Sequence, residues 1–112
     1  MNDIRLPYHR LHAFGVAVQF LESVKAAKVR DTKLRFEALK SAKGACCNTA
    51  EGAGRVTRAD KGRAFTIARA EVCEAAAAVE IAAIAGDARY EDAQRVIVIA
   101  NQLVGMLTRL IR

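Results

Sequence analysis

Proline, tryptophan and long apolar runs are almost or wholly missing from this sequence. Its one proline is Pro7, so nothing after that residue removes a helical hydrogen bond. There is no run of alternating β-branched residues, which argues against a sheet. No basic-then-apolar leader begins the chain, and no stretch of about 18 apolar residues exists to span a bilayer. We therefore expect an all-α protein in the cytoplasm, without a membrane association.

The residue sets that support catalysis or metal binding are missing as well. His9 and His12 are three residues apart, but no nearby cysteine or paired acid completes a zinc set. Glu71 and Glu74 lack the Glu-x-x-His partners that di-iron bundles require. Gly52 and Gly54 follow a predicted helix, whereas phosphate-binding glycine loops follow strands. We therefore expect no catalytic residue, no metal and no cofactor, and predict that the protein is not an enzyme.

Cysteine and aromatic residues are scarce, and we expect both kinds inside the fold. The cysteines, an odd number in a chain without an export signal, are Cys46, Cys47 and Cys73. They are expected to be reduced, small, buried apolar residues. Aromatic residues make up 5% of the sequence, and the phenylalanines are Phe14, Phe20, Phe36 and Phe65. Because these rings are expected in the core, base stacking on exposed rings is not expected.

Apolar residues, by contrast, are abundant and follow helical spacing. They make up 53% of 112 residues, which is enough for one domain with a modest core. A first helix is expected from about residue 8, with a core-facing stripe of Leu11, Phe14, Val18 and Leu21. Further helices are expected over about residues 33–51, 59–85 and 91–111. Short connections between four helices predict one domain, residues 1–112, folded as an antiparallel up-down-up-down four-helix bundle.

Polar and glycine residues mark the ends of these helices. Asp31 or Thr32 is a suitable cap for the second helix. Gly52 and Gly54 are expected to end it, because either can adopt the left-handed backbone conformation. Thr57 with Asp60 has the spacing of a capping box for the third helix, which Gly86 would end.

The fourth helix carries more apolar residues than one core needs. One seam consists of Val96, Ala100, Leu103, Leu107 and Leu110. Its flanks add Ile97, Ile99, Val104, Met106 and Ile111. A helix facing a single core is usually apolar at about three of seven positions. The alternative is deep burial within the bundle, but we expect the additional strip to form a subunit interface in a homo-oligomer.

Positive charge is concentrated in one part of the chain. The net charge is +6, and residues 31–63 contain eight basic and four acidic residues. Residues 64–86 contain one basic and three acidic residues. The candidate nucleic-acid-binding residues are Lys33, Lys40, Lys43, Arg55, Arg58, Lys61 and Arg63. Alternatively, these cations only solvate the surface or pair with Glu51 and Asp60.

The sharpest motif is the segment 48–55, which reads N-T-A-E-G-A-G-R. A glutamate near a helix C-terminus is unfavourable without a cation, and Arg55, Arg58 or the start of the next helix is the expected partner of Glu51. The segment resembles the S-I-P-A-N-I-A-E-G-F-G-R stretch of the four-helix-bundle family of 23S rRNA-intervening-sequence proteins. The matching residues are Asn48, Ala50, Glu51, Gly52, Gly54 and Arg55.

Two further segments carry the same resemblance. Arg63, Ile67, Ala68 and Glu74 are similar to the family's third-helix pattern R-F-L-Y-I-A-x-G-S-x-x-E. Residues 106–111 are similar to its closing M-L-x-x-L-I. The family is related to the accessory variability determinant proteins of diversity-generating retroelements. The resemblance implies a homopentameric ring, nucleic-acid binding and, in the retroelement branch, a reverse-transcriptase partner.

Two functions are therefore expected from the sequence. The first is a non-enzymatic, basic, oligomeric bundle that binds structured RNA or a ribonucleoprotein. The second is a structural or protein-partner scaffold whose positive charge is incidental, such as an accessory subunit of a reverse transcriptase.

Overall fold

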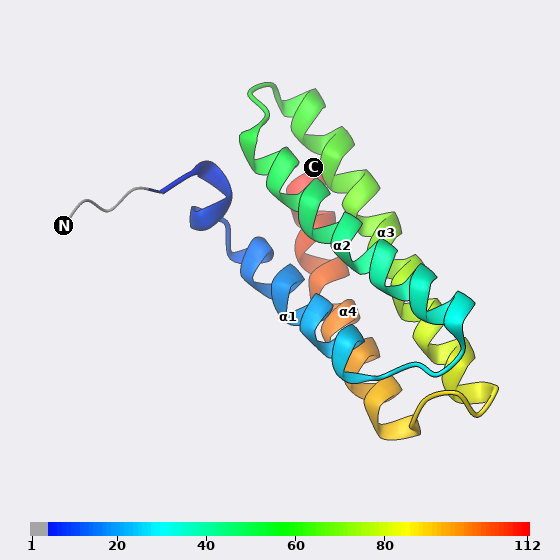
Figure 1. Ribbon diagram of the computed structural model, residues 1–112. Coiled ribbons are helices and arrows are strands. Elements are labelled where there is room, and N and C mark those ends of the chain that lie inside the picture. The colour runs from blue at the N-terminus through cyan, green and yellow to red at the C-terminus, as the bar shows by residue number, and fades with distance from the viewer. Residues whose placement is uncertain (1–4) are drawn as a thin grey trace.

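The computed structural model describes residues 5–112, and every regular element in that range is helical. A short 3-10 helix, η1, spans Pro7–Arg10. Four α-helices follow: α1 His12–Ala26, α2 Thr32–Gly54, α3 Arg58–Ile84 and α4 Tyr90–Ile111. They lie side by side in one bundle (Figure 1). The predicted all-α, four-helix fold is confirmed, and no helix among residues 5–112 is long and apolar enough to cross a bilayer.

Each helix packs against two neighbours around a common core. The most extensive contact joins α2 to α3, followed by that between α3 and α4. α1 packs on α2 and α4 and makes little contact with α3. The connections 27–31 and 85–89 meet at one end of the bundle, where the Arg30 amide donates to the Asp87 carbonyl over 2.8 Å. The Arg30 guanidinium also donates to the carbonyl of Gly86.

Local side-chain chemistry explains where α2 and α3 begin. The Asp31 carboxylate accepts a hydrogen bond from the Leu34 amide over 2.9 Å, as expected of a cap. The Thr57 hydroxyl accepts one from the Asp60 amide over 3.1 Å. The start of the first helix was predicted too early. Residues 7–10 form η1, and the extended backbone of Leu11 separates it from α1.

The predicted role of the two glycines at the end of α2 is wrong. α2 continues through Gly54, and among the described glycines only Gly86 has a positive φ, of 85°. Gly52 is instead required by packing, since a Cβ there would lie 2.4 Å from Cε1 of Phe65 on α3. Gly86, just beyond α3, does adopt the left-handed conformation predicted to end that helix.

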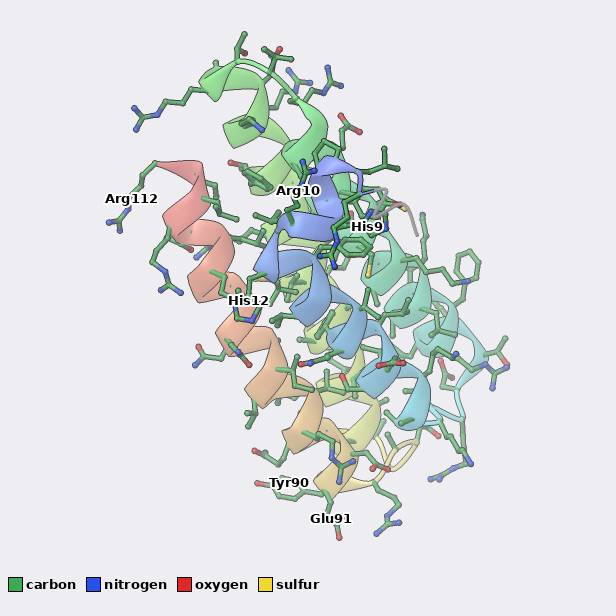
Figure 2. All side chains as sticks on the ribbon, turned by 90° about the vertical axis from the view of Figure 1, so that its left-hand side faces the viewer. His9, Arg10, His12, Tyr90, Glu91 and Arg112 are labelled. Atoms are coloured by element: carbon green, nitrogen blue, oxygen red, sulfur yellow. The ribbon has the colours of Figure 1, made fainter. Side chains whose placement is uncertain are left out.

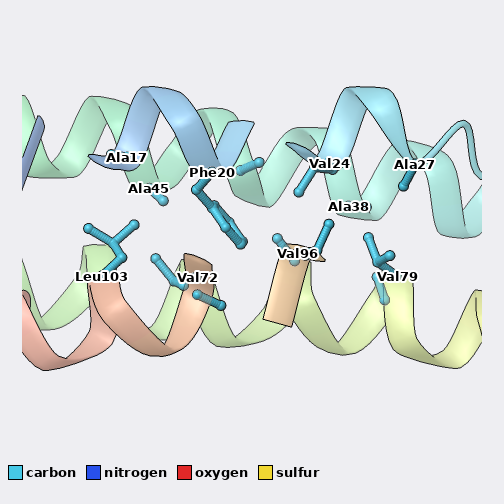
Figure 3. Packing of buried hydrophobic residues seen from close by; sticks show 14 of the residues in the cluster. Ala17, Phe20, Val24, Ala27, Ala38, Ala45, Val72, Val79, Val96 and Leu103 are labelled. Carbon is cyan, nitrogen blue, oxygen red and sulfur yellow. The ribbon is translucent and has the colours of Figure 1, made fainter. Parts of the chain in front are cut away.

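Small and branched side chains fill the space between the four helices. Phe20 of α1 reaches between the layers toward Val72, Val96 and Leu103 (Figure 3). The predicted stripe of α1 is shifted, because Leu11, Phe14, Val18 and Leu21 are only half-buried. The innermost positions of α1 are Ala13, Val16, Ala17, Phe20 and Val24. Alanine at many buried positions lets neighbouring helices approach closely, and a few larger side chains, among them Phe20, Leu103 and Leu107, fill the centre.

Candidate nucleic-acid interface

The seven predicted cations form two separate groups. Lys33, Lys40 and Lys43 lie on the outward side of α2, and we call these three residues the basic face. Arg55, Arg58, Lys61 and Arg63 lie where α2 ends and α3 begins, and we call these four the corner. No basic residue lies between positions 43 and 55. The structure therefore divides the single basic region that the sequence predicted.

The basic face is exposed and without acidic partners. Lys33, Lys40 and Lys43 recur at intervals of seven and three residues, which places them on one side of the helix. Within the described part of the chain, none of the three forms an ion pair. Glu37 lies one turn from both Lys33 and Lys40 on the same helix but forms no ion pair with either. Burial and the charge of Glu74 raise the pKa of Glu71 on α3, and the charge of Lys40 opposes them. These lysines are thus available for an anionic partner.

An exposed aromatic ring lies among these lysines. A hollow of about 500 Å³ is lined by Thr32, Arg35, Phe36, Leu39, Lys40 and Lys43. Phe36 is 61% exposed, so its predicted place in the core is wrong. The sequence did contain a signal of this exposure, because Phe36 follows Lys33 by three residues and precedes Lys40 by four. That spacing puts the ring on the lysine side of α2 and could have revealed its exposure.

At the corner, Glu51 pairs with a residue that the sequence predicted. The Arg55 Nη2 atom lies 2.6 Å from Glu51 Oε2, and Nε of the same guanidinium donates over 3.2 Å. The hydrogen bond and the charge of Glu51 raise the pKa of Arg55. Both side chains remain about half exposed, at 51% and 50%. Water screens such a pair, so it orders the corner without contributing much stability.

The other corner cations have different roles. Lys61 Nζ donates to the carbonyls of Ala53 and Gly52, over 3.0 and 3.3 Å, and thereby caps the last turn of α2. Arg63 lines a hollow of about 270 Å³ that also contains the Glu51 and Asp60 carboxylates. Arg58 is exposed at the first position of α3. Acidic side chains therefore share this corner with its cations.

The remaining motif residues serve mainly the fold. The side-chain amide of Asn48 donates a hydrogen bond to the Gly44 carbonyl one turn earlier, over 2.9 Å. Gly52 permits the contact with Phe65, whereas a Cβ on Gly54 would meet nothing within 4 Å. Glu74 is exposed on α3, and its charge helps to raise the pKa of Glu71.

Two cysteines are exposed, contrary to prediction. Cys46 is half-buried and donates to the carbonyl of Ala17 over 3.2 Å. Burial, with a smaller effect from Cys47, raises the pKa of the Cys46 thiol to about 11. Cys47 and Cys73 are exposed on α2 and α3. All three are free thiols, so no disulfide joins these helices.

Exposed apolar residues concentrate on α3 rather than on α4. The flanking residues predicted to form an additional strip on α4 are half-buried, and all of them except Ile97 pack against the core. The exposed large apolar residues of α4 are Tyr90 and Val98. The outward side of α3 carries five exposed apolar residues, which we call the apolar face: Ile67, Ala70, Ala77, Ile81 and Ile84. The exposed Glu74 lies among them, one turn from Ala70 and Ala77. The spacing of the five apolar residues, by three, four or seven positions, was visible in the sequence, but the alanines around them conceal which side faces outward.

The histidines do not form a metal set. His9 belongs to η1 and His12 begins α1, so the two are not on one helix (Figure 2). His9 Nδ1 accepts a hydrogen bond from the Leu6 amide over 3.0 Å. Over residues 5–112, no three His, Cys, Asp or Glu side chains are grouped to hold a metal ion. Comparison with models of known protein families and with curated proteins gave no match.

Proposed function

We propose that the protein is a non-enzymatic RNA-binding bundle that contacts phosphates through the basic face of α2. The observation that carries this proposal is the row of exposed lysines at positions 33, 40 and 43, none of which is paired with an acidic side chain. A lysine that is already paired would have to lose its partner before it could bind a phosphate. These three need no such exchange.

The geometry of the row suits an extended polyanion. With a rise of about 1.5 Å per residue, Lys33 and Lys40 are about 10 Å apart along α2, and Lys43 follows about 5 Å further. Neighbouring phosphates of a strand can therefore engage neighbouring lysines. Each contact releases condensed counterions, and this release makes affinity depend on salt.

The test is an RNA titration at several salt concentrations with the wild type and a triple variant, Lys33→Gln, Lys40→Gln and Lys43→Gln. Each lost phosphate contact should flatten the plot of log affinity against log salt by about 0.7 for a single strand. A control of equal charge is Arg89→Gln, Arg109→Gln and Arg112→Gln, which changes exposed residues at the ends of α4. This control should leave the slope closer to that of the wild type.

Two results of these titrations would contradict phosphate binding by the basic face. An absence of RNA binding by the wild type at low salt contradicts the proposal. Equal losses in the two triple variants would show that binding reflects only the overall charge of the protein. Circular dichroism melting of both variants establishes that the fold is retained.

We further propose that the protein is a homo-oligomer, a pentamer by its resemblance to the rRNA-intervening-sequence proteins. The apolar face of α3 supports the assembly, because its exposed isoleucines, of which Ile84 is 80% exposed, gain from burial against another copy. Short connections and the contacts between successive helices support an antiparallel up-down-up-down order. A ring would present the basic face repeatedly, so weak contacts to one RNA would add through avidity.

A protein-partner scaffold is the second candidate, and the same apolar face favours it. If a partner such as a reverse transcriptase covers Ile81 and Ile84, the bundle would act as an accessory subunit in the cytoplasm. This function does not require the lysines of the basic face. The charge variants therefore separate the two candidates, since a scaffold retains its partner when the three lysines are neutralised.

A further inference from the structure

We propose that the hollow around Phe36 on α2 binds an unpaired RNA base, which stacks on the exposed phenylalanine ring while flanking phosphates contact Lys40 and Lys43. The inference rests on the proposed RNA binding and adds what the basic face recognises: a single-stranded nucleotide in a loop, bulge or end. Double-stranded backbone alone would not use the ring.

The first observation is the exposure of the ring itself. Phe36 is 61% exposed, although inward positions on the same helix are filled by Ala38, Ala42 and Ala45. The ring contributes little to the core and still projects from a helix whose neighbouring outward positions are lysines. An aromatic side chain placed in this way has a flat apolar surface available for another π system.

The second observation is the charge around the ring. The charged residues that line the hollow are Arg35, Lys40 and Lys43, and no acidic side chain lines it. An apolar peptide or a second copy of this chain would bring its own apolar surface against three cations. A nucleotide matches the hollow better, because it combines an aromatic base with a negatively charged phosphate.

The third observation is the size and shape of the hollow. Its volume of about 500 Å³ is open on the outward side of α2, and Leu39 provides an apolar wall beside the ring. Duplex bases are already stacked on each other and present only their edges in the grooves. Unpaired bases, in contrast, can turn outward and stack on a protein ring.

The experiment compares two RNAs of equal length and charge, a hairpin with an unpaired loop and a blunt duplex, by fluorescence anisotropy. The proteins are the wild type, Phe36→Ala, Phe36→Tyr and the control Val98→Ala, which shortens an exposed apolar residue on α4. Phe36→Ala should weaken hairpin binding by about 5- to 150-fold, the effect of losing one base–aromatic stack. Duplex affinity and the salt slope should hardly change, because no charge is removed.

Phe36→Tyr keeps a stacking ring and should retain hairpin binding, as should Val98→Ala. A 2-aminopurine placed in the loop reports stacking directly through quenching of its fluorescence by the wild type but not by Phe36→Ala. Light scattering checks that the Phe36 variants keep the wild-type mass, since a lower mass would mean that the ring contacts another copy, which overturns the inference.

The possible failures are distinguishable. If the wild type binds hairpin and duplex equally and Phe36→Ala changes neither affinity, base stacking is wrong while phosphate binding by the lysines stands. If the wild type binds neither RNA at low salt, both the inference and the proposed function fail.

Discussion

The outward sides of α2 and α3 differ far more than their inward sides. Both helices turn alanines toward the core, among them Ala38 and Ala45 on α2 and Ala68 and Ala75 on α3. Outward, α2 exposes the three lysines of the basic face and a phenylalanine, whereas α3 exposes the isoleucines and alanines of the apolar face, with Glu74 among them. Packing therefore constrains one side of each helix and leaves the other free for interactions with different chemistry.

The two faces depend on one close helix contact. α2 and α3 share the most extensive interface of the bundle, and alanines on both sides keep it thin. At its corner end, the ring of Phe65 lies against Gly52, where a Cβ would come within 2.4 Å of the ring. A change at this contact should disturb both faces, whereas a change on one face should leave the other intact.

The largest effect is expected from Gly52→Ala. Alanine usually gains about 1 kcal/mol over glycine inside a helix. Here the new methyl group meets the buried Phe65 ring, and overpacking of this kind typically costs about 1–3 kcal/mol. We expect net destabilisation, measured as a lower midpoint of urea unfolding, together with weaker RNA binding.

Gly54→Ala is the matched control, because it lies in the same last turn of α2 and its Cβ would meet nothing within 4 Å. It should be neutral or slightly stabilising. Combining Gly52→Ala with Phe65→Leu should cost less than the two single changes together, since the smaller side chain makes room for the methyl group. Equal midpoints for the two glycine variants would contradict the packing role of Gly52.

The sequence predicted the helices better than it predicted their faces. Asp31 and Thr57 marked helix starts correctly because capping is a local interaction between a side chain and an amide a few residues away. The ends and faces depend on neighbours that the sequence does not reveal. Gly52 looked like a left-handed terminator, although it is a packing glycine against Phe65.

The candidate site was predicted in part. Lys33, Lys40 and Lys43 are exposed as expected, but Phe36 was assigned to the core because of its residue type rather than its position among those lysines. On α3, alanines occupy both buried and exposed positions, so apolar spacing does not identify the outward side. The flanking apolar residues of α4 are half-buried rather than fully exposed, and an interface on α4 stays a prediction.

The next effect should be confined to the apolar face. Ile81→Glu with Ile84→Glu adds two charges where we propose that another copy packs, and burying them there is unfavourable. We expect the double variant to dissociate toward the chain mass of 12.1 kDa, while its melting remains that of a folded bundle. Light scattering after gel filtration measures the mass.

Val98→Glu is the matched control, because Val98 is a 66% exposed apolar residue on α4. It should leave the oligomer intact. A double variant that keeps the wild-type mass would exclude the apolar face as the interface between copies. Dissociation by Val98→Glu instead would return the interface to α4, where the sequence had placed it.

The smallest effect concerns Glu71, which lies between the two faces. Its carboxylate fills the space beside Gly44 of α2, where a Cβ would come within 2.3 Å of Oε2. Burial raises the pKa of Glu71 above its ordinary 4.5, the charge of Glu74 raises it further, and Lys40 opposes both. Burial thus outweighs the attraction of Lys40.

The raised pKa of Glu71 makes the free energy of unfolding depend on pH. A carboxyl group with a higher pKa in the folded protein loses its proton more easily in the unfolded chain. The stability that the protonated Glu71 side chain gives the folded protein is therefore fully present below pH 4.5 and is lost as the pH rises through the folded-state pKa. Glu71→Gln remains neutral, so it should be slightly more stable than the wild type at pH 7 and equal to it near pH 4. Urea unfolding at the two pH values measures the difference, with Glu80→Gln, at another exposed glutamate of α3, as a control. If Glu71→Gln is instead less stable at pH 7, Glu71 and Lys40 attract each other strongly enough to form an effective pair, and Lys40 would have to leave that carboxylate before binding RNA.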